Sequence, residues 1–454
     1  MPATSLDLRT DLARRLAEAR DRTDRFFGLI AESALYERAI SERHRIIFYF
    51  GHLEAFDWNL IGRQVFGMES FHPEFDRLFA FGIDPVDGAL PSDVPGDWPS
   101  LDEVRAYRER ARAAVDACLA EADSAPATTR EGLAGGHVFQ IAIEHRLMHA
   151  ETLAYMLPHL PLEAFTPLAR VRPDTQPGPR EAGYGRTGGP GAVRRVVIPA
   201  GRATLGKSRA AGFGWDNELG EHVVDVPAFS IDARNVTNRE FLTFVRAGGY
   251  EDTRCWAPED LAWIKAHRVT HPVLWRRRAD GWWQRATFVE LPLPLDWPVQ
   301  VSLAEARAYA RWKGRRLPTE AELQRATYGT RTGPERPYAW GKDAPDARIH
   351  GNFDFQRWDP APVGGYPEGD SAFGVADLTG NGWEWTETVF APLPGFERDP
   401  FYPGYSEPFF DGKHYVIHGA SAQTDRVFLR RSFRNWFQPH YPYVFAAFRC
   451  VDHA

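Results

Sequence analysis

A segment rich in proline and glycine, residues 172–191, separates two parts of the chain that follow different patterns. Its sequence, RPDTQPGPREAGYGRTGGPG, contains almost no aliphatic side chain and therefore has nothing to bury in a core. At 454 residues the chain is also too long for a single hydrophobic core. We therefore predict two domains, residues 1–171 and 192–454, joined by this linker.

The first domain shows the periodicity of amphipathic helices. Apolar residues recur at intervals of three and four in four segments, which are residues 12–30, 43–61, 101–122 and 137–157. Four such helices predict an antiparallel bundle. The second and third are joined by an unusually long connection, residues 67–100, which we expect to cover a site.

The second domain is predicted to consist of short strands, turns and short helices. Residues 194–206 and 222–241 have the pattern of short strands closed by turns, and residues 302–327 contain two short helical patterns. Most of the 15 tryptophans and 30 phenylalanines follow residue 210, so the two domains differ in architecture. The chain is therefore expected to be of the α+β class.

The composition argues against several classes of protein. A formal net charge of -7 offers no broad basic surface for nucleic acid or for a membrane, which favours a small-molecule partner. The 3 cysteines show no CxxC spacing, so neither a disulfide framework nor a thiolate zinc site is indicated. The charged N-terminus lacks the apolar core of a signal peptide, and no apolar run is long enough to span a membrane. We expect a cytoplasmic protein.

Two histidines, His145 and His149, lie four residues apart in the last predicted helix of the bundle. Side chains one turn apart project from the same face, so two imidazoles can bind one metal ion. His52 is the best third ligand because it lies in the middle of the second predicted helix, among apolar and aromatic residues. Three neutral imidazoles suit zinc, copper, iron or nickel. A histidine pair of this spacing also occurs on amphipathic helices that bind no metal.

Three neighbouring residues compete less well for such an ion. Glu151 is rotated by about 200° from His149 and cannot complete the same grip. His44 precedes the apolar part of its helix, and His137 follows two glycines at a predicted helix start. We expect the two histidines to be surface or capping residues, and Glu151 to support a ligand or pack between helices.

The segments GHLEAFDWN, residues 51–59, and HRLMHAE, residues 145–151, together resemble the DinB-like bundle of the ergothioneine-type sulfoxide synthases. In that family a histidine plus an HxxxHxE motif supplies a three-histidine site for non-haem iron. The part after the linker resembles the formylglycine-generating-enzyme fold, a C-type-lectin-like fold that those synthases also carry. This second resemblance rests on phrases that occur in the family's order: IPAGRATLG, VTNREF, LPTEAELQRAT, DLTGNGWEWTETVF and FAAFRC.

The resemblance implies an enzyme that uses iron(II) and O2 to join a sulfur or selenium donor to the imidazole C2 carbon of hercynine, the trimethylated betaine of histidine. It implies that His52, His145 and His149 are the iron ligands. A site with three nitrogen ligands leaves open positions where two substrates can meet. Hercynine and a donor, either a thiol or a selenosugar, are the expected partners.

The resemblance also implies a substrate site in the second domain. Asn435 and Trp436, in FRNWF, match positions that hold hercynine in relatives, where a tryptophan face can attract the trimethylammonium group. Tyr402 and Tyr405, in YPGYSEPFF, match two family tyrosines, of which one donates a proton and one lines the betaine site. Tyr402 takes the first role. The tryptophans of GNGWEW are expected to be structural.

Several positions depart from the family pattern. His418 stands where relatives commonly have an arginine, and Met148 stands where some have a glutamine that contacts the betaine carboxylate. Phe437, which we also expect to contact substrate, begins the stretch FQPHY, where members that use γ-glutamylcysteine have an aspartate and then a basic residue. Loss of these charged groups favours a neutral, sugar-like donor. This predicts the selenoneine synthase branch, which takes selenium from a selenosugar, with cysteine, γ-glutamylcysteine or a thiosugar as alternative donors.

Two other classes of function remain as alternatives. A formylglycine-generating oxidase would need copper-binding cysteines late in the fold, where Cys450 stands alone. A non-catalytic module that binds a ligand would leave the histidines as residues of the bundle core. Metal analysis discriminates between this second alternative and an enzyme.

Overall fold

The computed structural model describes residues 5–80, 90–122, 130–167, 169 and 194–453. The chain divides into two compact units, Met1–Pro173 and Asp174–Ala454. The predicted linker, residues 172–191, lies outside the described residues, as does the part of the long connection at residues 81–89.

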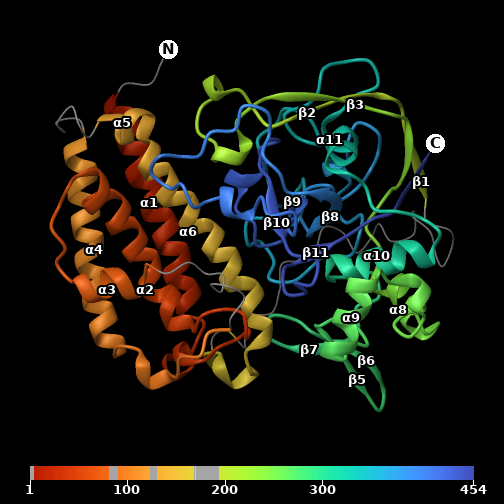
Figure 1. Ribbon diagram of the computed structural model, residues 1–454, viewed down its shortest axis with the longest axis horizontal. Coiled ribbons are helices and arrows are strands. Elements are labelled where there is room, and N and C mark those ends of the chain that lie inside the picture. The colour runs from red at the N-terminus through yellow and green to blue at the C-terminus, as the bar shows by residue number, and fades with distance from the viewer. Residues whose placement is uncertain (1–4, 81–89, 123–129, 168, 170–193, 454) are drawn as a thin grey trace. The chain divides into compact units, whose positions relative to one another are not determined.

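The first unit is helical. Its α-helices are α1 (Ser5–Phe27), α2 (Ile46–Asp57), α3 (Pro73–Leu78), α4 (Leu101–Glu121), α5 (Arg130–Leu133) and α6 (His137–Met156). The four longer helices, α1, α2, α4 and α6, lie on the four segments predicted from hydrophobic periodicity and confirm the bundle (Figure 1). Nearly every described residue of α2 and of α6 is buried, so these two helices form the centre of the bundle.

The second predicted helix changes its winding part of the way along. Helix α2 continues directly into a π-helix, η2 (Trp58–Val65), where an uninterrupted α-helix was expected to residue 61. The ring of Trp58 packs over residue 62, where a Cβ would lie 2.2 Å from the ring, so only glycine leaves room there. Short π-helical turns of this kind are frequent at functional sites.

The second unit contains small sheets and short helices. Its strands are β1 (Arg195–Ile198), β2 (Gly201–Leu205), β3 (His222–Val226), β4 (Phe229–Asp232), β5 (Trp275–Arg278), β6 (Gly281–Arg285), β7 (Glu290–Pro292), β8 (Gly382–Val389), β9 (Tyr415–Ala420), β10 (Asn435–Phe437), β11 (Ala446–Ala447) and β12 (Val451–His453). Its α-helices are α8 (Asn238–Arg246), α9 (Pro258–His267), α10 (Leu303–Trp312) and α11 (Glu320–Tyr328). The strands predicted in residues 194–206 and 222–241 and the two helices predicted in residues 302–327 are all present.

The strands pair mainly in antiparallel fashion. The described sheets have the strand orders β1-β4-β12, β10-β9-β8-β11, β2-β3 and β5-β6-β7, and β11 pairs with β8 in parallel. Strand β8 lies inside its sheet and carries Trp383 and Trp385, both fully buried, in agreement with a structural role. Beside them, the buried guanidinium of Arg449 donates two hydrogen bonds of 2.6 Å to the carboxylate of Glu384.

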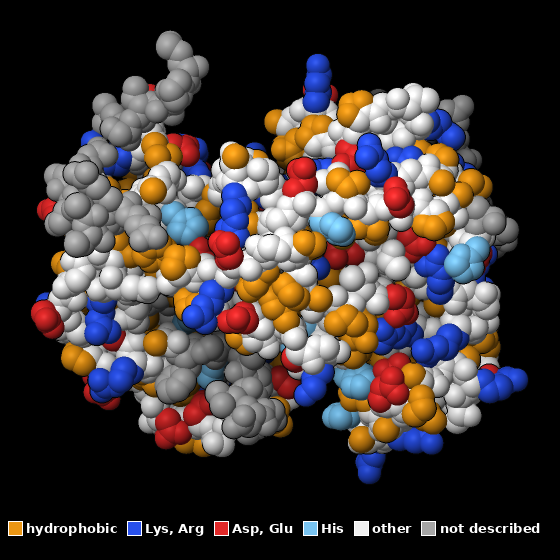
Figure 2. Space-filling model, turned by 45° about the horizontal axis from the view of Figure 1, so that its top comes forward, with side chains coloured by type: hydrophobic (Ala, Val, Ile, Leu, Met, Phe, Trp, Pro, Cys, Tyr) orange, Lys and Arg blue, Asp and Glu red, His pale blue; other side chains and the backbone are white. Residues whose placement is uncertain are grey.

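Within the described residues, no helix combines the length and apolar character needed to cross a bilayer. On the face shown in Figure 2, acidic and basic side chains are interspersed rather than gathered by sign. On this face, the described side chains form no broad basic area of the kind that binds a phosphate backbone.

Candidate metal centre

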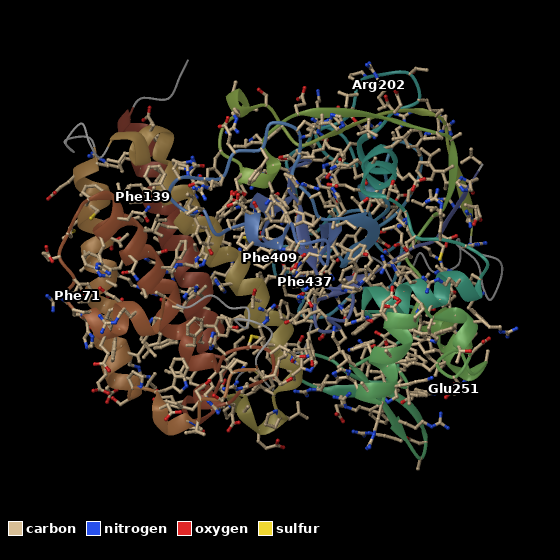
Figure 3. All side chains as sticks on the ribbon, viewed as in Figure 1. Phe71, Phe139, Arg202, Glu251, Phe409 and Phe437 are labelled. Carbon is tan, nitrogen blue, oxygen red and sulfur yellow. The ribbon has the colours of Figure 1, made fainter. Side chains whose placement is uncertain are left out.

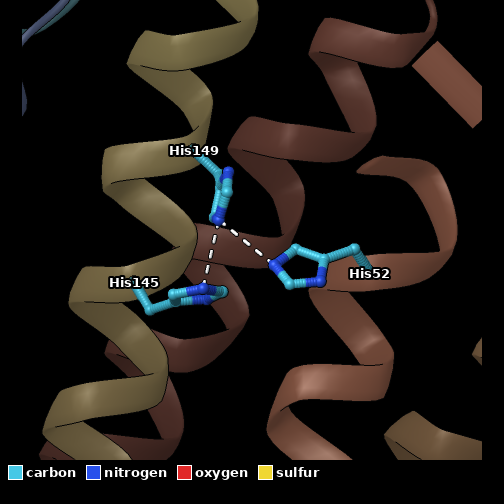
Figure 4. A group of neighbouring side chains, drawn as sticks. All are labelled: His52, His145 and His149. Atoms are coloured by element: carbon cyan, nitrogen blue, oxygen red, sulfur yellow. Dashed lines mark hydrogen bonds between the residues drawn. The ribbon is translucent and has the colours of Figure 1, made fainter. Parts of the chain in front are cut away.

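Helices α2 and α6 bring the three predicted histidines together inside the first unit. The Nε2 atom of His149 lies 3.2 Å from Nε2 of His52 and 3.1 Å from Nε2 of His145 (Figure 4). All three side chains are buried, and their ligand atoms lie within 4.8 Å of one another. Two nitrogens bound at right angles to one ion, each about 2.1 Å from it, would be about 3.0 Å apart. The two measured separations fit that arrangement.

Burial keeps the three imidazoles neutral. It lowers the pKa of His52 from 6.5 to about 4, and it lowers the pKa values of His145 and His149 well below 6.5. The neighbouring imidazoles depress these last two pKa values further, because protonating one ring would place a charge beside another. Neutral rings present lone pairs, so the residues present fit a divalent transition metal such as zinc, copper, iron or nickel.

A backbone carbonyl sets the tautomer of His52. Its Nδ1 atom donates a hydrogen bond of 2.6 Å to the carbonyl of Phe79, which leaves only a lone pair on Nε2. Phe79 belongs to the long connection between α2 and α4. Gly51 allows the ring of Phe79 to lie close to α2, because a Cβ at position 51 would lie 2.5 Å from that ring. A metal-binding histidine almost always donates its second ring N–H in this way, which fixes the ring and raises its basicity.

Two phenylalanine rings pack against the histidines. Phe56 stacks on His145 with ring centroids 3.5 Å apart, and Phe48 stacks on His52 at 4.9 Å. Both phenylalanines come from α2, as His52 does. The rings restrict the orientation of the imidazoles and give the centre an apolar wall.

Glu151 and the remaining nearby histidines take no part in this group. Among the described His, Cys, Asp and Glu residues, the set able to hold an ion is His52, His145 and His149. Glu151 is buried on α6, the half-buried His44 packs against the ring of Phe48 at 4.2 Å between centroids, and His137 is the first residue of α6. Met148, half-buried on α6, immediately precedes His149 in the chain.

The second unit brings together three of its predicted substrate residues. Tyr405 lies 5.8 Å from Tyr402 and 5.4 Å from Trp436, measured between ring centroids. Trp215 stacks on Tyr405 at 3.9 Å, and Phe390 stacks on Trp436 at 4.1 Å. We call these five residues the aromatic cluster. Trp215 and Phe390 were not expected from the sequence, because no spacing pattern links either residue to the tyrosines.

The other two predicted substrate residues of this unit lie beside Trp436 on strand β10. The side-chain carbonyl of Asn435 accepts a hydrogen bond of 2.8 Å from the backbone N–H of Trp436. Phe437 stacks on Tyr441, with ring centroids 5.4 Å apart. The ring of Phe409 lies 5.5 Å from that of Trp436, and both Phe409 and Phe437 are labelled in Figure 3.

His418 carries no charge at the position where the family pattern led us to expect an arginine. It is buried on strand β9, and its Nε2 accepts a hydrogen bond of 2.9 Å from the amide of Gln324. Burial lowers the pKa of His418 below 6.5, so the ring is neutral at physiological pH. This position therefore offers no cation to a carboxylate.

Comparisons with known proteins match both units. The model of the sulfatase-modifying factor enzyme 1-like domain matches residues 190–454, and that of the DinB superfamily matches residues 15–153. A hercynine oxygenase of Mycolicibacterium thermoresistibile is 34% identical over 99% of this chain and 96% of its own. A hercynine oxygenase of Mycobacterium tuberculosis is 42% identical over 52% of this chain and 55% of its own. Ergothioneine biosynthesis protein 1 of Neurospora crassa is 27% identical over 93% of this chain. This chain spans about half, 55%, of the length of that protein.

Proposed function

The chain belongs to the ergothioneine-type sulfoxide synthase family, and we propose that it is an O2-dependent enzyme that joins a sulfur or selenium donor to the imidazole C2 carbon of hercynine. The observation that carries this proposal is the buried group of three neutral imidazoles in the DinB-like unit. The relative named hercynine oxygenase that aligns over nearly the whole chain supports the same substrate.

Iron(II) is the proposed metal, held by His52, His145 and His149. Neutral imidazoles suit iron(II), and when bound it would supply the one-electron chemistry that a reaction with O2 requires. The remaining tasks fall to the protein. The Phe79 carbonyl holds His52 in the tautomer that points a lone pair at the metal, and Phe48 and Phe56 keep the centre apolar.

The aromatic cluster is the proposed site for hercynine. One face of Trp436 is covered by Phe390, and the ring remains half-exposed, so it can receive the trimethylammonium group by a cation–π contact. Tyr405, which stands edge-on to Trp436, would line the same site together with Asn435 and Phe437. Met148, on α6 of the first unit, is proposed separately as a residue that contacts substrate. Tyr402 is half-exposed beside Tyr405, and we assign it the role of proton donor.

The proposed donor is a neutral selenosugar, which would make the chain a selenoneine synthase. His418 is neutral and already paired with Gln324, so it cannot take the place of an arginine that binds a carboxylate. Phe437 and Tyr441 present stacked rings where charged partners of an amino-acid donor would be needed. Cysteine, γ-glutamylcysteine and a thiosugar are the alternative donors.

The test is an assay of the protein reconstituted with iron(II) under anaerobic conditions and then given hercynine, O2 and one donor at a time. We expect O2 uptake coupled to a product with a new bond at imidazole C2, and no product from the His52→Ala variant. A protein that takes up no stoichiometric iron and is unchanged by His52→Ala would instead be a non-catalytic binding module. Turnover with cysteine equal to that with the selenosugar would refute the donor preference alone.

A further inference from the structure

A fully buried arginine joins the two helices that carry the histidines. Arg146 follows His145 directly on α6, and its guanidinium reaches across to α2. It donates hydrogen bonds to both carboxylate oxygens of Glu54, at 3.1 and 2.8 Å, and to one of Asp57 at 2.7 Å. It also donates to the backbone carbonyl of Leu53 at 3.0 Å. We call Arg146, Glu54 and Asp57 the arginine triad.

The triad is tied to the rest of the bundle through Glu54. Arg112, on α4, donates to the same carboxylate at 2.6 Å and pairs with Asp24 of α1 at 2.6 Å. Arg108, one turn earlier on α4, also pairs with Asp24, at 2.7 Å. The network therefore connects α1, α2, α4 and α6 around a carboxylate that is almost completely buried.

Stability alone gives a weak reason for burying such a group. The free energy lost when paired charges leave water is about as large as the free energy gained from their attraction. Apolar residues of similar volume therefore often give the same stability. A planar guanidinium makes the pairing directional, because its N–H groups are fixed in a fork and donate to two partners only in one geometry. The triad is therefore suited to setting the position of α2 relative to α6.

The contact points of the triad lie next to the histidines. Arg146 adjoins His145 in the chain, and the carbonyl it binds belongs to Leu53, which adjoins His52. A slip of α2 along α6 by one residue would move His52 by about 1.5 Å, half of the 3.2 Å that separates its Nε2 from that of His149. Such a slip would displace the acceptors on Leu53, Glu54 and Asp57 from the guanidinium by the same distance.

We infer that the arginine triad is a positioning element of the metal centre: it holds α2 against α6 in the register that brings the three Nε2 atoms together (Figure 4). The residues of the triad do not belong to the group of possible metal ligands and act through the backbones beside His52 and His145. The inference rests on the proposed function only in requiring that the three histidines bind a metal.

The experiment measures cobalt(II) binding to the full-length, metal-free protein, because the visible absorption of cobalt(II) reports the geometry of its ligands. The variants are Arg146→Lys, which keeps the charge but loses the fork, and Asp57→Asn, which keeps the shape but weakens the pair. The control is Arg449→Lys, since Arg449 makes an equally buried two-pronged pair with Glu384 in the second unit. Thermal unfolding of each metal-free variant is recorded in parallel.

We expect both triad variants to bind cobalt(II) about 10- to 100-fold more weakly, as loss of a supporting partner does at other metal sites, and to show an altered absorption spectrum. The control should unfold at a lower temperature but keep the affinity and spectrum of the parent protein. If Arg146→Lys does not fold, Asp57→Asn decides the matter. Unchanged affinity and spectrum in the triad variants, or equal losses in the control, would overturn the inference. A parent protein that binds no cobalt(II) would overturn the metal centre itself.

Discussion

Replacement of Gly51 by alanine is expected to damage the metal centre more than it damages the fold. Gly51 lies in α2 directly before His52, and a Cβ at this position would lie 2.5 Å from the ring of Phe79. The ring must therefore shift, and because it is fully buried we expect it to move the backbone of Phe79 away from α2. Because the Phe79 carbonyl accepts the 2.6 Å hydrogen bond from His52, this movement releases the imidazole.

Two effects on the fold oppose each other in this variant. Alanine is favoured over glycine in the middle of a helix by about 1 kcal/mol, whereas overpacking a core costs about 1–3 kcal/mol. The free energy of unfolding of the metal-free protein should therefore fall by roughly 0–2 kcal/mol. Metal affinity should fall by about 10- to 100-fold, because the partner that orients a ligand is lost.

The assay combines calorimetric titration with cobalt(II) and chemical unfolding of the metal-free protein. The matched control is the double variant Gly51→Ala/Phe79→Leu, which shortens the clashing side chain but keeps the backbone carbonyl at position 79. It should recover most of the metal affinity that Gly51→Ala loses. A Gly51→Ala protein that is more stable than the parent and binds cobalt(II) equally well would refute the reasoning.

Three further outcomes are expected. Burial lowers the pKa of His52 to about 4, so the unfolded chain takes up this proton at higher pH than the folded one. The free energy of unfolding of the metal-free protein should therefore decrease as pH falls from about 6.5 toward 4, and less so in His52→Leu; identical pH profiles would contradict this. Tyr402→Phe should keep its affinity for metal but divert the donor to simple oxidation without a bond to hercynine, and an unchanged ratio of products would show that Tyr402 is not the proton donor. Trp436→Leu should raise KM for hercynine about 5- to 30-fold, the loss of a cation–π contact of about 1–2 kcal/mol, and an unchanged KM would remove Trp436 from the substrate site.

The first unit shows three features that sequence reasoning did not find. The sequence offered no signal for the acceptor of His52, because Phe79 contributes a backbone carbonyl that any residue possesses. Arg146 lies inside the histidine motif, and its position in an apolar helix was a signal that a buried partner must exist. The π-helix after α2 was also missed, since a tryptophan packed over Gly62 does not alter the hydrophobic pattern.

The sequence by itself determined the positions of the helices in the first unit and which residues share one face of a helix. Hydrophobic periodicity located the four longer helices of the first unit, and spacing alone placed His145 and His149 on one face of α6. Tertiary structure decided contacts across elements that the sequence did not predict: Phe79 with His52, Arg146 with Glu54, and Trp215 with Tyr405. The physical reason is that periodicity describes a single helix or strand, whereas contacts between elements depend on the register in which their surfaces pack.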